Sequence, residues 1–461
     1  MIGRYTLSRI GDVWTLRNQY DTWLDVELAA LQAMEITGQV PKGTMAAVKA
    51  SVYVDERRIA EIEAEIGHDM LAFIRSLEEQ AGDHGRYIHR GLTSSDVKDT
   101  ALSLQIKDSL EVLTEATKAL WLTLMRKAEK NAEVVIIGRT HGMHAEPTTL
   151  GLKMLVWADE VLRRIRSLET ASKLISVGKF SGPVGTYSEV LPDVEKLACD
   201  ELTLTPATAS NQVIQRDLHA EVMAALALLA STLEKIALNI RLLHGTDIGE
   251  VMEPKPHGSS SMPHKQNPNT CETVCGLARM VRANLMPMLE NVALFHERDM
   301  THSSVERVAL PDSFILAYYM TVKLIGVIGG LVVNNTRIEA NLRTTQGAIY
   351  SQQLLLKLVD LGMSRTDAHD IVRTAYDHAR LKGTDMFIEV ARSVGTAQFG
   401  LDADAVRREI EGGVIEHLVG TSKQLIAEAK SRTRSERERL ELEETITKVL
   451  EEELGPGPER W

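Results

Sequence analysis

The segment between Pro206 and Gly245 contains neither glycine nor proline, and apolar residues recur along it at helical spacing. These residues are Val213, Ile214, Leu218, Val222, Leu226, Leu229, Leu233, Ile236, Ile240 and Leu243. The periodicity predicts one unbroken helix on the order of 50 Å long, at about 1.5 Å per residue. A helix of that length buries its apolar stripe only by packing against other helices of similar length.

Other long stretches repeat this pattern, from Val97 to Ala132, from Leu152 to Val177 and from Asn269 onward. Aromatic residues make up only 4% of the chain, and the composition favours helices over strands. The closely spaced glycines of VGKFSGPVGTYS (177–188) predict a small hairpin or a looped excursion. We therefore expect an all-α fold, in which a three-lobed chain is built around a central bundle of long helices.

Breaks in the helical pattern divide the chain into three predicted domains. Residues 1–92 carry shorter helical stretches separated by glycine and proline, and are predicted to form an N-terminal helical domain. Residues 93–340 hold the long stretches and are predicted to form the central bundle. Residues 341–461 are predicted to form a C-terminal helical domain, with a charged tail that we interpret as a solvated terminal helix.

Charge, cysteine content and hydropathy exclude several classes of protein. The net charge of −12 argues against a broad basic face for nucleic acid, although a locally basic pocket can still hold a small anion. Three cysteines and no apolar signal core at the N-terminus lead us to expect a cytoplasmic protein without disulfides. The apolar run from Phe314 to Val333 is long enough for a membrane span, but Lys323 interrupts it. We interpret this run as a buried bundle helix and expect no membrane partner.

The segment RYIHRGLTSSDVKDTALSL (86–104) combines a helix start with several hydroxyl groups. Thr93 and Asp96 have the spacing of a capping box ahead of a long helix. Hydroxyls and free backbone N–H groups at a helix start also suit a carboxylate or a phosphate. A cap alone does not need Ser94 and Ser95, so the anion-binding interpretation stays open beside the capping one.

The segment GRTHGMHAEPTTLGLKM (138–154) places Arg139, His141 and His144 close together, at the expected mouth of a helix. Two histidines at this spacing could bind a metal, but no third ligand lies nearby in sequence. Proton transfer and anion binding suit the group better. A purely structural histidine in a helix-start turn remains the alternative. Cys271 and Cys275 likewise lack the further ligands of a metal site.

The loop GSSSMPHKQNPN (258–269) lies between two predicted helices. Its glycine and serines give mobility and hydroxyl groups, two prolines restrict the backbone, and Lys265 supplies a cation. A closing lid that carries a base and stabilises a developing oxyanion needs these groups. The alternative is a solvated linker, which needs neither the flanking prolines nor the lysine.

Further polar residues stand out singly in the segments EIGHDMLAF, SNQVIQRD and HERDMTHSSVER. They are His68, Asp69, Gln212, Arg298, Ser303 and Arg307. On the residue pattern alone a structural role explains each of them.

The loop GSSSMPHKQNP resembles the signature loop of the fumarase/aspartase superfamily of fumarate-forming lyases. The segments HRGLTSSDVKDTALSLQ and GRTHGMHAEPTTLGLK resemble the adenylosuccinate lyase branch in particular. The segments RYTLSRIGDVW, QVIQRD and HERDMTHSSVER are also similar to that branch. The similarity spans about residues 1–390.

The resemblance implies a role for each matching residue. His141 would be the general acid, oriented by Glu272, and Ser259 would be the base. Ser260, Lys265 and Asn267 would hold the carboxylate that takes up negative charge. The remaining implied site residues are His68, Asp69, His89, Thr93 and Ser94 around the succinyl group, Gln212 on the substrate, and Arg4, Tyr5, Arg298, Ser303 and Arg307 around the nucleotide and its phosphate.

The resemblance also implies the reaction and the assembly. The reaction would be a β-elimination of fumarate from adenylosuccinate, and from the analogous succinylaminoimidazole carboxamide ribotide of purine biosynthesis, without a metal or an organic cofactor. The assembly would be a homotetramer whose active sites are shared between chains. Another fumarate-forming lyase of the same superfamily, such as an argininosuccinate lyase, is the alternative.

Overall fold

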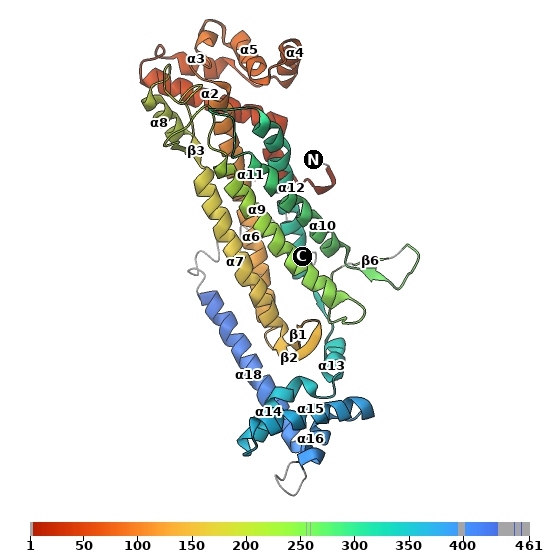
Figure 1. Ribbon diagram of the computed structural model, residues 1–461. Coiled ribbons are helices and arrows are strands. Elements are labelled where there is room, and N and C mark those ends of the chain that lie inside the picture. The colour runs from red at the N-terminus through yellow and green to blue at the C-terminus, as the bar shows by residue number, and fades with distance from the viewer. Residues whose placement is uncertain are drawn as a thin grey trace. The chain divides into compact units, whose positions relative to one another are not determined.

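The computed structural model describes residues 3–254, 256–258, 260–394 and 402–431, together with Thr447 and Glu453 (Figure 1). The predicted base Ser259 and most of the charged tail lie outside the described residues. The chain divides into two compact units, and neither is continuous in sequence. Unit 1 comprises Met1–Lys118, Arg163–Leu233 and Gly276–Val322, and unit 2 comprises Ala119–Leu162, Glu234–Cys275 and Lys323–Trp461. The division into three domains at residues 92 and 340 stays a prediction.

Unit 1 contains a cluster of short helices around α2, against which α3 and α8 pack (Figure 1). Its core gathers aromatic residues, including Tyr20, Trp23 and Phe73. The elements that lie wholly in this unit are η1 (Gly3–Tyr5), α1 (Ser8–Val13), α2 (Leu16–Ile36), α3 (Thr44–Ser51), α4 (Glu56–Ile66), α5 (Asp69–Ala81), η2 (Gly82–Tyr87), β3 (Val177–Gly178), α8 (Pro192–Glu201), β4 (Thr205–Pro206) and α11 (Leu285–Glu290).

Unit 2 contains a hairpin and a second group of short helices, in which α14, α15 and α16 pack in sequence (Figure 1). Its core includes Ile349, Leu354 and Phe387. The elements that lie wholly in this unit are β1 (Val135–Thr140), β2 (Met143–Thr149), β5 (Val251–Met252), β6 (His257–Gly258), β7 (Gln266–Asn267), β8 (Val332–Val333), α13 (Asn335–Arg343), η3 (Ala348–Tyr350), α14 (Ser351–Asp360), α15 (Arg365–Lys382), α16 (Met386–Val394) and α18 (Ala403–Ser431).

Five helices contribute residues to both units, and they correspond to the long stretches expected from the sequence. They are α6 (Ser94–Lys130), α7 (Leu150–Ile175), α9 (Asp217–His244), α10 (Asn269–Ala283) and α12 (Thr301–Gly329). Strands in the described residues form only two-stranded pairs, so the all-α fold class is confirmed. The helices α9 and α12 are apolar enough to cross a membrane by composition, but 61% and 72% of their most apolar windows are buried inside the protein.

Of the two forms expected for residues 177–188, the looped excursion is confirmed and the hairpin is wrong. Val177 and Gly178 pair in parallel with Thr205 and Pro206, and turns, bends and irregular structure follow them. A hairpin instead forms upstream, where β1 pairs antiparallel with β2, and α7 begins only after it at Leu150. Because β-branched residues are consecutive at 134–137 and at 148–149, this segment suits strands better than the helix mouth expected there.

A buried network of charges joins three parts of unit 1. Arg216, just before α9, makes two hydrogen bonds to Asp99 of α6, at 2.8 and 2.9 Å. On its other side, Arg216 Nε lies 3.0 Å from Glu306 Oε1 of α12. The Arg216 side chain is 1% exposed, and both carboxylates are 6% exposed. Buried charges must be paired to be tolerated, so this network fixes α6 and α12 against the segment before α9.

A second buried pair lies near the start of α6. Asp96 contacts Lys179, and both side chains are fully buried. Asp96 also accepts a hydrogen bond of 2.8 Å from the backbone N–H of Thr93. This is the reciprocal half of the predicted capping box, so the capping interpretation of Thr93 and Asp96 is confirmed.

Replacement of Arg216 by Met should strongly destabilise the protein. The change leaves two buried carboxylates without their cation, which typically costs about 3–5 kcal/mol. The urea unfolding midpoint at fixed protein concentration measures the loss. Arg57→Met is the matched control, because the Arg57 side chain is 89% exposed and should change stability by no more than about 0.5 kcal/mol. Equal midpoints for the two variants would contradict a structural role for the network.

The network should also make stability depend on pH. Burial raises the pKa of Glu306 from 4.5 to about 7, although Arg216 opposes this shift. Between pH 4.5 and 7 the native state therefore keeps Glu306 protonated, while the unfolded state has released that proton. The stability that Glu306 contributes is fully present below pH 4.5 and is lost as pH rises through 7. Relative to Glu306→Gln, the wild type should lose stability between pH 5 and 8, on the order of 1–3 kcal/mol. Unfolding midpoints of both proteins, with Glu297→Gln as the exposed control, measure this loss, and parallel pH profiles would refute it.

Candidate active site

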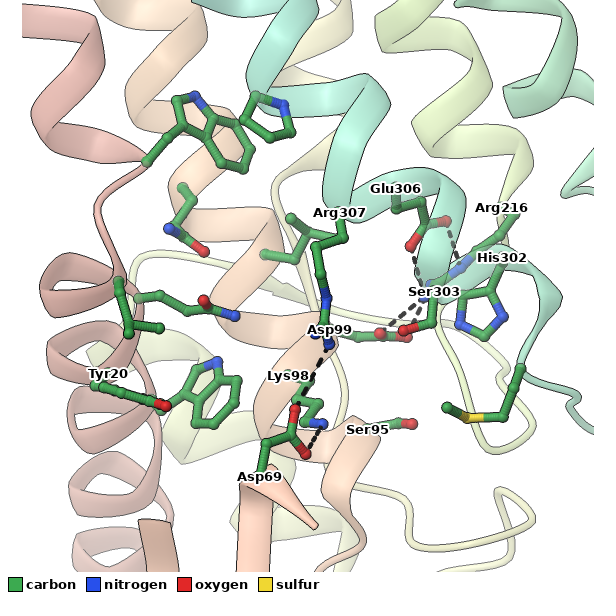
Figure 2. A pocket seen from close by; sticks show the side chains of 18 of the residues that line it. Tyr20, Asp69, Ser95, Lys98, Asp99, Arg216, His302, Ser303, Glu306 and Arg307 are labelled. Carbon is green, nitrogen blue, oxygen red and sulfur yellow. Dashed lines mark hydrogen bonds and ion pairs between the residues drawn. The ribbon is translucent and has the colours of Figure 1, made fainter. Parts of the chain in front are cut away.

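A cavity of about 510 Å³ in unit 1 gathers charged residues from distant parts of the sequence (Figure 2). Its walls come from α2, the start of α5, the first turns of α6 and α12, and the segment before α12. Predicted site residues Asp69, Arg298, Ser303 and Arg307 all line it. Aromatic side chains close another side, and they are Trp14, Tyr20 and Trp23.

Asp69 lies between two cations in this cavity (Figure 2). Lys98 Nζ donates to Asp69 Oδ1 at 2.6 Å, and Arg307 lies 3.6 Å from Oδ2. Burial alone would raise the pKa of the Asp69 carboxyl, but the hydrogen bond and charge of Lys98 outweigh it, so the pKa lies below its usual range. Asp69 is therefore ionised at neutral pH and holds Lys98 in place.

A chain of side-chain hydrogen bonds connects further predicted residues. Arg298 donates to the amide oxygen of Gln212 at 3.3 Å, and the Gln212 amide nitrogen donates to the Thr93 hydroxyl at 3.3 Å. Ser94 is the first residue of α6, beside Thr93. The structure thus brings the helix start that was predicted to bind anions next to Arg298, which lines the cavity.

The remaining predicted residues of unit 1 have well-defined local roles. His68 caps α5, because its Nδ1 accepts a hydrogen bond from the backbone N–H of Leu71 at 3.2 Å. His89 has a φ of 59° and its Nδ1 lies 2.6 Å from Glu27 Oε1. Burial would lower the pKa of His89, but the charge and hydrogen bond of Glu27 outweigh it and raise the pKa.

Arg4 and Tyr5 form the short helix η1. The Tyr5 ring packs edge-on against Tyr319, with centroids 5.1 Å apart. The Arg4 side chain is exposed. Neither residue lines the cavity of about 510 Å³.

Ser95, whose hydroxyl the sequence had singled out at this helix start, lines the cavity from α6. Sequence reasoning missed Lys98, which also lines it from α6 and has its Nζ 5.3 Å from the centroid of the Trp23 ring. Lys98 follows Ser94 by four residues, so helical spacing placed it on the same face and could have identified it. His302 also lines the cavity, and burial lowers its pKa to about 4. Nothing in the sequence pattern pointed to that burial.

The predicted acid lies in unit 2. His141 occupies the tip of the β1–β2 hairpin with a φ of 54°, next to Gly142 with a φ of 76°. Its side chain is exposed. The hairpin is anchored by Arg139, which makes two hydrogen bonds to the buried Glu250 at 3.0 and 2.6 Å. His141 is therefore exposed on the surface of its unit, at the tip of a hairpin that the Arg139–Glu250 ion pair holds in place.

The other predicted residues of unit 2 lie in the glycine- and serine-rich loop or just after it. Ser260 and Lys265 are exposed, and Asn267 pairs with His257 between β7 and β6. Glu272, in the first turn of α10, is 51% exposed and lies 4.0 Å from Arg241. The expected acid and lid thus belong to one unit, and the residues expected around the succinyl group and the nucleotide belong to the other.

A metal site finds little support in the described residues. No group of three His, Cys, Asp or Glu side chains in that part of the chain is arranged to hold a metal ion. Burial raises the pKa of the Cys271 thiol, which disfavours the thiolate that a metal needs. Burial, with Arg139 nearby, lowers the pKa of His144. That the reaction needs no metal or cofactor stays a prediction.

Comparisons with known proteins identify the family of this chain. A family model described as lyase matches residues 3–283. The chain is 44% identical over 409 residues to the adenylosuccinate lyase of Synechocystis sp., covering 88% of this chain and 95% of the relative. It is 46% identical over 379 residues to that of Aquifex aeolicus, covering 81% and 87%. A crystal structure of a fumarate lyase from Mesorhizobium sp. BNC1 matches with a TM-score of 0.80 at 27% identity, covering 91% of this chain and 99% of that one. The chain therefore belongs to this lyase family and, within the fumarase/aspartase superfamily, to the adenylosuccinate lyases.

Proposed function

We propose that this protein cleaves adenylosuccinate to AMP and fumarate, and that it cleaves the analogous succinylaminoimidazole carboxamide ribotide in purine biosynthesis. The observation that carries the proposal is the cavity in unit 1, where residues matching one family's substrate-binding set converge from α5, the segment before α12 and α12 itself. Relatives named adenylosuccinate lyase at 40–46% identity support it. No observation favours the argininosuccinate lyase alternative.

The cavity suits a substrate that carries a phosphate and two carboxylates. Lys98, Arg298 and Arg307 supply cations, and Ser303 supplies a hydroxyl. Arginine and lysine bind such anions through charge-assisted hydrogen bonds. The Arg307 side chain is 70% exposed and its contact with Asp69 is long, at 3.6 Å, so an incoming anion can replace that contact. The aromatic wall offers a flat apolar surface for the purine ring.

The elimination breaks two bonds and forms one double bond. A base removes the proton from the carbon next to a carboxylate, and the electron pair forms the carbon–carbon double bond of fumarate. The bond between carbon and nitrogen breaks, and an acid delivers a proton to the nitrogen that stays on AMP. Negative charge builds up on the carboxylate during proton removal, so cations already placed beside it lower the barrier.

We assign the base to Ser259 and the acid to His141. The Ser259 assignment rests on the resemblance of its loop, since this residue lies outside the described part of the chain. The exposed position of His141 at a hairpin tip lets it reach a substrate that other parts of the protein hold. Lys265, Asn267 and Ser260 would stabilise the charged carboxylate, and Glu272 would orient His141.

We further propose a homotetramer in the cytoplasm, with each site shared between chains. The acid and the lid lie in a different unit from the residues assigned to the succinyl group and the nucleotide, which suits a site built from several copies. Large apolar side chains on the long helices also remain exposed in the single chain, among them Val156 at 59%, Leu238 at 44% and Leu242 at 58%. Such exposure on helices of this length favours coverage by other chains.

Purified protein should convert adenylosuccinate to AMP and fumarate, and the reaction can be followed by its ultraviolet change. Ser259→Ala should lower kcat by about a thousandfold or more with little effect on substrate binding, because the hydroxyl acts mainly in the transition state. Ser260→Ala is the matched neighbouring control and should be milder. Cleavage of argininosuccinate in place of adenylosuccinate would overturn the proposed function, and near-normal kcat in Ser259→Ala would place the base elsewhere.

Two inactive variants should restore one another if sites are shared. His141→Gln and Ser259→Ala, mixed equally, dissociated and reassembled, should recover about a quarter of wild-type activity, because each site draws its acid and its base independently from the two kinds of chain. Each variant treated alone should stay inactive. Recovery at background level, with mixed tetramers visible on native gels, would mean that one chain supplies both groups.

A further inference from the structure

A second cavity, of about 810 Å³, lies wholly within unit 2. One wall is the turn of the β1–β2 hairpin, and the others come from η3, α14, α15 and the residue Thr345. None of its lining residues belongs to the proposed catalytic or substrate-binding set. Gly142, however, directly follows His141 in the chain, so the cavity borders the hairpin turn that carries the proposed acid.

The charge of this cavity is positive. Arg365, His369 and Arg373 line it, and their spacing of four residues places them along one face of α15. All three side chains are exposed. Neither arginine has an ion-pair partner among the described residues, whereas His369 lies 3.5 Å from Asp370. No carboxylate is among the lining residues, so an anion that enters meets no repulsion from the wall.

Part of the cavity lining is apolar, and it comes from η3, α14 and α15 itself. Ile349, Leu355 and Val372 are 3%, 9% and 5% exposed, and their side chains line it beside the half-buried Tyr376. An inorganic anion alone would leave this surface without a partner. An anion that carries a flat or apolar body would cover it.

Two polar atoms of the lining residues lack partners. The Nδ1 atom of His144 and the hydroxyl of Thr345 are both shielded from solvent, and neither has a hydrogen-bond partner in the described residues. Shielded polar atoms are normally paired. Because water does not reach these two atoms, the arginines and the apolar lining, and not these atoms, point to a ligand. The two atoms lie on the hairpin and before η3, on different elements from the arginines.

We propose that this cavity is a second ligand site, separate from the catalytic one, which binds a nucleoside monophosphate. The arginine face of α15 holds the phosphate, and the apolar wall with Tyr376 holds the base and sugar. The volume lies within the range of about 300–1,000 Å³ that is typical for sites of small ligands. The proposal stands on the cavity of unit 2 alone and does not depend on the proposed reaction.

Calorimetric titration of the intact protein with AMP tests the proposal. The wild type should bind two AMP molecules per chain, one in the catalytic site and one in this cavity. Arg373→Gln should weaken one of the two by about tenfold to a hundredfold, as expected for one lost charge-assisted hydrogen bond. Arg380→Gln is the matched control, because Arg380 is also an exposed arginine of α15 but does not line the cavity.

Two further arms separate the outcomes. Arg307→Gln should weaken the other AMP site only, so loss of all AMP binding in that variant would overturn the second site while the proposed function stands. If the protein does not cleave adenylosuccinate but still binds AMP in a way that Arg373→Gln weakens, the proposed function is wrong and the second site stands. Titration with inorganic phosphate should give much weaker binding than AMP. Equal affinity for the two would overturn the nucleotide assignment, and identical AMP binding by Arg373→Gln and Arg380→Gln would overturn the site itself.

Discussion

The buried pairing of Arg216 with Asp99 and Glu306 is the constraint on which the cavity of unit 1 depends. Both carboxylates are sequence neighbours of cations in the cavity, since Lys98 precedes Asp99 and Arg307 follows Glu306. On each helix the carboxylate therefore pairs with the buried Arg216, while the adjacent cation contacts Asp69 in the cavity (Figure 2). A rotation of either helix that moved its cavity cation would break a buried ion pair, which is strongly unfavourable.

The same arrangement explains how the cavity balances its charges, because four carboxylates line it beside four lysine and arginine cations. Asp69 holds Lys98 at 2.6 Å and Arg307 at 3.6 Å, so positive charges that would otherwise repel one another share a counter-ion. A phosphate or a carboxylate of the substrate would take over part of this role. Binding then replaces ion pairs with Asp69 by ion pairs with the substrate. The cations are already in position before the substrate arrives, so binding does not have to gather them.

The long helices could be predicted from the sequence because their signal is local and repeated. The stretch after Pro206 gave α9, and the stretches from Val97 and Leu152 gave α6 and α7 within a few residues. The β1–β2 hairpin could not be predicted as easily, because glycine, proline and two histidines separate its two short runs of β-branched residues. For the cavity, resemblance supplied Asp69, Arg298, Ser303 and Arg307. Lys98 was missed although helical spacing pointed to it, and the buried state of His302 depends on contacts distant in sequence.

Each compact unit is assembled from three separate segments of the chain, and this has a consequence for biosynthesis. Unit 1 needs residues up to Val322, and unit 2 needs residues beyond Lys323. Neither can therefore be completed while the ribosome is still making the middle of the chain, in contrast to proteins whose N-terminal domain folds first. The apolar residues of α6 and α7 emerge long before α12, whose Glu306 shares Arg216 with Asp99 of α6, has been made. The nascent chain thus has to stay soluble while these apolar side chains are exposed. Such exposed apolar segments are what chaperones bind during translation.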